Sequence, residues 1–314
     1  MAYTNTDTNM TSSSALSAGM QTYYNRELLR TFEPNLVHLQ FGDEHRMPPH
    51  SGLVMNMRKL IPLETNTKAL SEGDPGESVM LAETEVTVQL QQYGEYARCT
   101  DKLDLTHLDM DIMRRTKLFG DAGARSIDAV VREELAKCAN VIYAGGKASR
   151  AELTAADKLT SRELRKAVKT LKKNHAQTFG GYFVAIIGPD TMYDLQEDEA
   201  FVKVSQYQDK ENIYTGEVGR LFGVRLVETT EAKIFEGAGA SGADVASVIV
   251  LGQYAYGVTS LKGAKPRVIV KSAGSAGTAD PLDQISTVGW KMDGFGAKLL
   301  QPEYAVRIEC GFSA

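Results

Sequence analysis

The sequence predicts an α+β fold, and three features of the chain support that prediction. The stretch from Gly52 to Asp101 has the pattern of two strands joined by a long acidic tip. A long helical pattern follows it directly, and a shorter amphipathic helix comes after that. Beyond these helices, glycine- and alanine-rich loops separate the predicted strands, without an internal repeat and without the sustained alternation of strand and helix that a doubly wound sheet requires.

The first feature reads as an extended β-ribbon. In its second arm, apolar side chains at Val86, Val88 and Leu90 alternate with polar ones, which is the period of a strand with one exposed face. Arms of about ten residues extend roughly 35 Å, and an isolated two-stranded ribbon of that length is only marginally stable. We therefore expect the ribbon to rest on another copy of the chain. Its parts are a first arm (53–64), a tip (66–78) and a second arm (83–98).

The helix that follows the ribbon is expected to be unusually long. Thr106 and Asp109 suggest an N-terminal cap, and apolar or small residues then keep three- and four-residue spacing. The predicted helix covers Asp109–Ala144, about 35 residues or ~50 Å. Gly120 and Gly123 weaken it locally.

The remaining elements are shorter. A helix over Ser161–Asn174 is amphipathic, with leucine and valine on one face and lysine and arginine on another. Asp293-Gly294 indicates a turn between two strands near the C-terminus. The other predicted elements are a helix over Gln21–Glu33, a buried strand over Tyr182–Ile187, a short helix from Asp190, and strands over Val224–Glu228, Val245–Leu251 and Arg267–Val270.

Composition restricts the class of protein. A chain of 314 residues with a net charge of −5 suits one or two globular domains and argues against a general nucleic-acid binder, whose charge would be basic. No apolar run approaches the length that spans a bilayer, so no membrane partner is expected. The polar N-terminus does not resemble a signal peptide, and the three dispersed cysteines suggest thiols in a protein folded in a cytoplasm.

No catalytic, cofactor or metal site is predicted. The segment Gly237–Gly242 matches a dinucleotide fingerprint in form, but a strand-like segment follows it where that fingerprint needs a helix. Gly145-Gly146-Lys147 lacks the upstream glycine of a phosphate loop. Two groups of possible metal ligands have simpler explanations: His38, His45 and His50 as surface histidines in a loop, and His107 with Asp109 and Asp111 as part of a helix cap.

Charge is segregated along the chain. Seven acids face one base, Lys68, between Leu63 and Glu95, whereas seven bases face one acid, Glu163, between Lys158 and Lys173. Both regions could be ordinary solvated faces, and the basic face could contact nucleic acid. The sharper hypothesis is that the acidic ribbon of one subunit meets the basic helix of another. The candidate interface residues are Lys68, Glu72, Asp74, Glu77, Glu83, Glu85, Arg162, Arg165, Lys166, Lys169, Lys172 and Lys173.

A combination of short motifs, in this order, resembles the major capsid proteins of tailed bacteriophages, in the branch related to the N4-type phage. The resemblance covers nearly the whole chain from about residue 21 onward. The motifs are Tyr23-Tyr24 and Leu28-Leu29; Leu70-Ser-Glu-Gly73 with Pro75; Gln92-Tyr93-Gly94 with Asp101; Leu164-Arg-Lys-Ala167 with Leu171; Ile187-Gly-Pro-Asp190 with Leu195; Gly216-Glu-Val-Gly219-Arg-Leu-Phe-Gly223-Val224; Val288-Gly-Trp-Lys291; and Gln301-Pro-Glu303.

The resemblance implies the Hong Kong-type phage capsid fold. The implied parts are an N-terminal arm (1–51), an extended loop or β-ribbon (52–101), a peripheral domain with a spine helix (102–155), an axial domain (156–280) and C-terminal strands that return to the peripheral domain (281–314). It also implies a structural protein, not an enzyme. Such proteins form pentamers and hexamers that close an icosahedral shell around the phage genome, in a virion capsid assembled in the host cytoplasm.

The resemblance further implies partners. These are other copies of the chain, the portal, decoration or cement proteins, and packaged genomic DNA on the inner face. Only about fifty residues precede the ribbon, so a separate scaffolding protein is expected as well. One relative cross-links a loop lysine to an asparagine of its neighbour, but nothing else in this sequence supports that chemistry for Lys68. The alternative function is a soluble protein that binds nucleic acid or uses a nucleotide.

Overall fold

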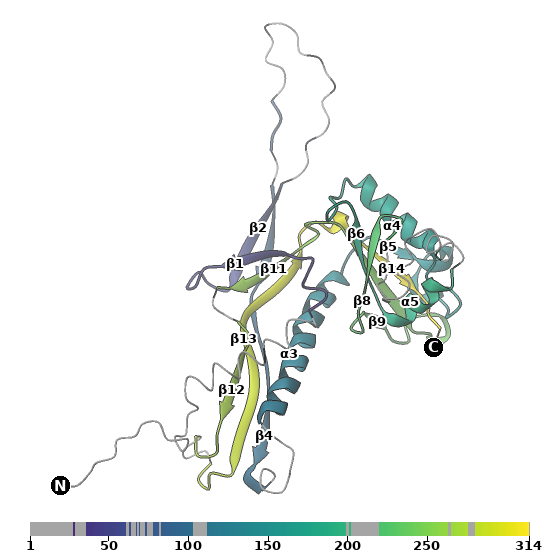
Figure 1. Cartoon of the computed structure of the whole chain (residues 1–314). Coiled ribbons are helices and arrows are strands. Elements are labelled where there is room, and N and C mark those ends of the chain that lie inside the picture. Colours follow the sequence, from purple (N-terminus) through teal and green to yellow (C-terminus); the bar gives the residue numbers. More distant parts are fainter. Residues whose placement is uncertain are drawn as a thin grey trace, which may run out of the picture.

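The computed structural model has two units side by side, one of which carries a two-stranded ribbon at one end (Figure 1). One is an elongated sheet with a long helix along it, which we call the long unit. The other, the compact unit, is a seven-stranded sheet with two helices. This arrangement confirms the predicted α+β class. The described residues are 28, 36–60, 63, 67, 69, 73, 78–81, 83–102, 112–198, 201, 220–262, 265–275 and 280–313.

The long unit is organised around one strand, β13. β13 is 15 residues long and pairs with β4 along one side and with β11 and β12 along the other, while β1 extends the sheet beyond β11. The helix α3 packs along this sheet. The elements are β1 (Asp43–Met47), β4 (Gln91–Thr100), α3 (Ile112–Leu135), β11 (Tyr256–Leu261), β12 (Arg267–Lys271) and β13 (Ile285–Leu299).

The compact unit has the sheet order β5-β14-β10-β6-β8-β7, with β9 pairing the start of β10. All seven residues of β10 and all five of β6 are buried, because both faces of the sheet are covered. The elements are β5 (Val141–Tyr143), α4 (Ser161–Lys173), β6 (Phe183–Ile187), α5 (Pro189–Gln196), β7 (Arg220–Leu221), β8 (Val224–Glu228), β9 (Ile234–Phe235), β10 (Val245–Leu251) and β14 (Ala305–Cys310), with short 3₁₀ turns at 144–146, 150–152, 240–242 and 302–304.

A continuous apolar core joins the two units. Along β6, Phe183 and Ile187 face the core under α4 and α5, whereas Val184 and Ile186 face a second core. That second core also contains Val131 of α3 together with buried residues of β11 and β13. Because the second core includes side chains from both units, packing fixes their relative orientation.

A buried polar pair holds the segment ahead of β1 against α3. The backbone N–H of His38 donates to Oδ1 of Asp128 at 2.7 Å, and His38 Nδ1 lies 2.5 Å from Oδ2 of the same carboxylate. The hydroxyl of Tyr256 donates to the carbonyl oxygen of His38. Burial, together with the nearby Asp128 charge, raises the pKa of Tyr256, which keeps that hydroxyl protonated.

This pair corrects the prediction for His38, whose side chain is 1% exposed and not at the surface. Its partner lies 90 residues away, and no local pattern indicated it. Of the other two histidines, His50 is exposed outside any strand, as predicted, whereas His45 is part-exposed beside Asp43 but lies on β1 and not in a loop.

The predicted long helix ends earlier than expected. Its described part begins at Ile112 and ends at Leu135, 24 residues or about 36 Å, and the chain then turns into β5. The guanidinium of Arg307 donates to the carbonyl oxygen of Ala136, which ends the helix with a partner from β14. The apolar spacing continued beyond the helix because Cys138 is buried in the second core on a non-helical backbone.

The ribbon is also shorter than predicted. β2 (Val54–Leu60) pairs with β3 (Glu83–Gln89) over seven residues each, about 23 Å of strand. After Leu90 the second arm enters the long unit as β4 and pairs with β13. The predicted alternation is confirmed near the base, where Val88 and Leu90 are buried, and burial decreases outward to the exposed Thr84.

One further expectation needs correction. Asp293-Gly294 is no turn between strands: β13 continues through it, with a register shift between Met292 and Phe295 and a φ of 69° at Gly294, which is a glycine β-bulge. Strand membership in the two sheets does not follow the order of the chain. β11 and β12 belong to the long sheet although they fall within 156–280, and β14 belongs to the compact unit although it falls within 281–314.

Other predicted elements agree with the structure. The strands over Val224–Glu228 and Val245–Leu251 are β8 and β10, and the amphipathic helix from Ser161 is α4. The strand over Tyr182–Ile187, the helix from Asp190 and the strand over Arg267–Val270 correspond to β6, α5 and β12. The arm helix (apart from Leu28), the cap at 106–109, the His107 cluster and most of the ribbon tip lie outside the described residues.

Replacing His38 by alanine should destabilise the isolated subunit by about 3 kcal/mol, because the Asp128 carboxylate is left buried without its partner. Chemical denaturation of the unassembled chain measures the change. The control is His45→Ala, which removes a part-exposed contact with Asp43 and should change the free energy of unfolding by less than about 1 kcal/mol. Equal stability of the two variants would contradict the assignment of His38 as an anchor.

Candidate intersubunit interface

The ribbon leaves the body of the molecule as a two-stranded hairpin. Among the strands that the structure describes, β2 and β3 pair only with each other, so both outer edges lack a third strand. Beyond these strands several large apolar side chains are exposed: Leu63 by 54%, Met80 by 90% and Leu81 by 74%. Exposed apolar side chains beside unpaired strand edges are typical of a surface that another protein covers.

The ribbon is anchored at its base. Met57 is buried, and its sulfur lies close enough to Gly257 of β11 that a Cβ there would approach it to 3.0 Å. Lys59 Nζ donates to Glu303 Oε2 at 2.7 Å. This hydrogen bond lowers the pKa of Glu303, so the carboxylate stays charged at neutral pH. Lys59 lies opposite Thr84 near the outer end of the paired strands, so the anchor fixes the whole β2–β3 hairpin, which we call the ribbon base, to the loop between β13 and β14 (Figure 1).

A cleft of about 580 Å³ lies between the ribbon base and the end of α4. Val86 of the ribbon, Tyr304 of the β13–β14 loop and Asn174 at the end of α4 contribute to its lining. Asn174 Nδ2 also donates to the carbonyl oxygen of Glu303 at 2.9 Å. The end of α4 and the ribbon base therefore occupy the same side of the molecule.

The basic helix α4 has one buried face and one exposed face. Leu164, Val168 and Leu171 pack into the core of the compact unit. Of the six predicted basic residues, Lys166 is half-buried and lies 3.8 Å from Glu163, and Arg165 lies over the ring of Phe222. Within the described residues no ion pair involves the other four, which are all exposed: Arg162, Lys169, Lys172 and Lys173.

The structure describes only some of the residues of the predicted interface. Lys68, Glu72, Asp74 and Glu77 lie outside the described residues. Glu83 and Glu85 are exposed on β3, and neither pairs with α4 of the same chain.

The charge count of the sequence began too late to include Arg58, the partner of Glu83. Arg58 Nη1 lies 3.5 Å from Glu83 Oε2, and β2 carries both Arg58 and Lys59. The described ribbon strands are therefore nearly balanced in charge, and the acidic excess belongs to the tip. Sequence reasoning also missed the Lys59–Glu303 anchor, whose members are 244 residues apart and share no pattern.

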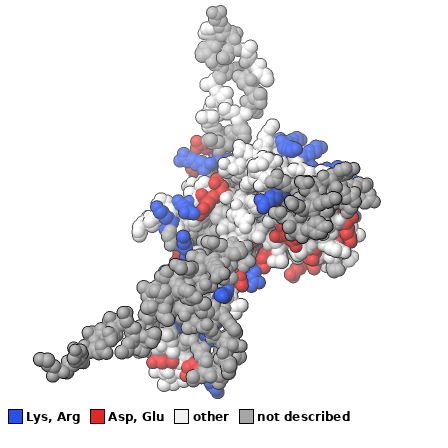
Figure 2. Space-filling view, in the orientation of Figure 1, with Lys and Arg blue, Asp and Glu red and all other residues white. Residues whose placement is uncertain are grey.

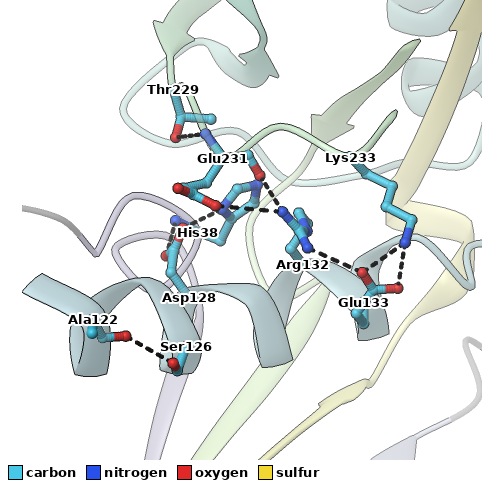
Figure 3. A network of polar contacts seen from close by, with 9 residues as sticks. All are labelled: His38, Ala122, Ser126, Asp128, Arg132, Glu133, Thr229, Glu231 and Lys233. Carbon is cyan, nitrogen blue, oxygen red and sulfur yellow. Dashed lines mark hydrogen bonds and ion pairs between the residues drawn. The ribbon is translucent and has the colours of Figure 1, made fainter. Parts of the chain in front are cut away.

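A second polar network ties the two units together (Figure 3). Arg132 of α3 donates to the carbonyl oxygen of Glu231 at 2.8 Å, and Lys233 Nζ lies 2.8 and 3.0 Å from the carboxylate oxygens of Glu133. Burial raises the pKa of Glu133, but Lys233 and Arg132 outweigh it, and the pKa lies below its ordinary value. The network fixes the loop after β8 to α3 and so reinforces the shared core.

The features described above are hydrogen bonds, ion pairs and exposed apolar side chains, which are typical of surfaces that bind other proteins. In the part of the chain that the structure describes, no group of three or more histidine, cysteine or acidic residues could hold a metal ion. Gly237–Gly242 precedes β10, a strand, so the helix that a dinucleotide site needs is replaced by other structure.

None of the described helices is long and apolar enough to cross a membrane.

Comparison with known proteins identifies the family. The model of the family described as "Phage capsid protein" matches residues 83–308. No curated protein matches the sequence. Among solved structures, the fold is similar to the capsid of cyanophage Pam1 (14% identity, TM-score 0.68) and to that of Ralstonia phage GP4 (15%, 0.68), each covering 100% of this chain and 98% of the other. The capsid of cyanophage P-SCSP1u is also similar (16%, 0.67), covering 88% and 89%.

The similarity in structure extends over the ribbon as well as both units, since two of these alignments cover the whole chain. At such low identity it establishes the fold, and the family model, which covers well over half of the chain, establishes the family. The N4-type branch stays a prediction. The chain belongs to the phage capsid protein family, and its fold is the Hong Kong-type fold of tailed-bacteriophage major capsid proteins.

Proposed function

We propose that this chain self-assembles into pentamers and hexamers, which close an icosahedral shell around the phage genome. The observation that carries the proposal is the ribbon: it is anchored at its base, has two unpaired edges and exposes large apolar side chains. A second copy of the chain supplies the surface that such a ribbon needs. The phage capsid family and fold support this function and imply a structural role.

The distribution of rigid and projecting parts suits a shell made of one protein. A shell requires head-to-tail contacts that close on themselves, at slightly different angles in pentamers and hexamers. The shared core and the Arg132–Glu231 and Glu133–Lys233 contacts keep the two units as one body. The ribbon, held at its base by Lys59 and Met57, can adjust its angle to each neighbour. Several weak contacts per subunit then add up to a stable shell.

The expected domain division, the remaining partners and the location follow as proposals from the same function. The ribbon is the extended loop, α3 the spine helix, the long unit the peripheral domain and the compact unit the axial domain. A scaffolding protein, a portal, decoration proteins and packaged DNA are the proposed partners, and the chain resides in the virion capsid after assembly in the host cytoplasm. The contact between the acidic ribbon tip and a neighbour's basic helix stays a prediction.

Electron microscopy of the purified protein tests the function directly. We expect closed shells of uniform size, either from the protein alone or after addition of factors from a phage lysate. Sedimentation that shows only monomer under all of these conditions would contradict self-assembly. Tight, salt-sensitive binding of DNA by such a monomer would instead favour the alternative of a nucleic-acid-binding protein.

The ribbon anchor predicts a dependence on pH. Because the folded-state pKa of Glu303 is lowered from 4.5, the anchor stabilises the ribbon above that value and is lost as the pH falls through the lowered pKa. Lys59→Ala should therefore speed hydrogen exchange in β2 and β3 severalfold at pH 7, and this effect should shrink as the pH is lowered below 4.5, because the unaltered protein then progressively loses the anchor as well.

The matched control for this prediction is Arg58→Ala, which removes an exposed cross-strand contact of 3.5 Å and leaves the anchor in place. It should change exchange less than Lys59→Ala at pH 7. If both variants exchange alike at pH 7, or if the Lys59→Ala effect does not shrink on acidification, the anchor does not hold the ribbon.

A further inference from the structure

The compact unit has two ends of opposite charge. One end is formed where β6 begins and β10 finishes, and α4 also ends there, at Asn174. The last two turns of α4 expose Lys169, Lys172 and Lys173 on this end. The carboxylate of Glu303, also at this end, is already paired with Lys59. We call these three lysines the basic end.

The opposite end is formed where β6 and β8 finish and β10 begins. Four exposed acids lie near these strand ends and near β9. No described residue forms an ion pair with any of them. We call them the acidic end: Asp190 at the start of α5, Glu228 at the end of β8, Glu236 after β9 and Asp244 before β10.

Two cations near the acidic end already have partners within the chain. Lys158 lies 2.9 Å from Asp194 and also contacts Glu197, and Lys233 pairs with Glu133. Lys147, which follows β5 at this end, is exposed, so four exposed acids stand against one exposed lysine and the end keeps an excess of negative charge. In Figure 2 basic side chains lie along the upper border of the compact unit and acidic ones along its lower border.

The two ends of one chain cannot meet each other. The seven residues of β10 separate them by about 23 Å. A second copy, related to the first by the rotation that closes a pentamer or hexamer, can place its acidic end against the basic end of the first. Such a contact is head to tail and can repeat from subunit to subunit. Charges that one chain leaves uncompensated are thereby matched across the contact.

The ribbon indicates on which side that second copy lies. The ribbon base shares a cleft with the end of α4, and the ribbon projects toward the same side as the basic end (Figure 1). In a head-to-tail contact, all features on this side meet the opposite side of the neighbour. In this arrangement the α4 lysines of one subunit face the acidic end of its neighbour, and the ribbon covers a different part of the neighbour's surface.

We propose that the basic end of α4 docks on the acidic end of the compact unit of the neighbouring subunit. The proposal rests on the proposed shell function and names a different partner for the α4 lysines than the ribbon tip. Exposed pairs of this kind are individually weak and screened by salt. Their role is to set the register and speed of assembly, and the buried apolar contacts of the ribbon supply the larger share of the affinity.

Zero-length cross-linking of shells made from the unaltered protein tests the contact. A carbodiimide joins a lysine amine to a carboxylate that touches it, and mass spectrometry identifies the pair. We expect links from Lys169, Lys172 or Lys173 to Asp190, Glu228, Glu236 or Asp244, present in shells and absent from monomer. Links from these lysines to ribbon acids such as Glu83 or Glu85, without any to the acidic end, overturn the proposal.

Charge reversal provides the second test. Lys169→Glu with Lys172→Glu and Lys173→Glu should leave the fold of the monomer intact and slow shell formation at least tenfold. Adding Asp190→Lys, Glu228→Lys and Glu236→Lys should restore assembly. The matched control reverses three exposed lysines of the long unit, Lys117, Lys262 and Lys265, with the same change in net charge and a smaller expected effect.

The outcomes separate this proposal from the shell function. An equal loss in the control, normal assembly of the triple reversal, or rescue by reversed ribbon acids alone overturns the docking contact while the unaltered chain still forms shells. If the triple reversal does not fold, the cross-links in unaltered shells decide. Failure of the unaltered chain to form shells overturns the shell function itself.

Discussion

A two-stranded ribbon with unpaired edges is only marginally stable by itself, and this constraint governs how the rest of the molecule is arranged. β2 and β3 have no third strand among the described residues, and the buried contacts of the ribbon are confined to its base, at Met57, Val88 and Leu90. Beyond the base, the described side chains of Leu63, Met80 and Leu81 are exposed, which is costly in water unless another surface covers them. In the proposed function another copy of the chain supplies that surface, and covering these side chains contributes to assembly.

The rest of the molecule forms one rigid body, to which the ribbon is attached. A single apolar core contains Ile186 of the compact unit, Val131 of α3 and Trp290 of β13. The buried His38–Asp128 pair fixes the segment ahead of β1 to the same helix. The ribbon base, which Lys59 holds to Glu303, is thus attached to a body whose two units keep one relative orientation. Variation in angle between neighbours is left to the ribbon.

Local patterns predicted much of this structure, and long-range contacts account for what they missed. The predictions of α4, β8 and β10 were correct because each element buries the positions at which its own sequence places apolar residues. The end of α3 was missed because Arg307, from β14, ends it, and His38 was misplaced because Asp128 buries it. At the candidate interface, the exposed lysines of α4 could be predicted from helical spacing. The Lys59–Glu303 anchor and the charged ends of the compact unit depend on how distant strands align, which spacing does not reveal.

Hydrogen exchange of the ribbon, compared between monomer and assembled shells, tests the central claim most directly. If the ribbon finds its covering surface only on another copy, the backbone amides of Val54–Leu60 and Glu83–Gln89 that point away from the partner strand exchange rapidly in the monomer and become strongly protected in shells. Equal protection of these amides in the two states would contradict the account, because the ribbon would then be complete within a single chain.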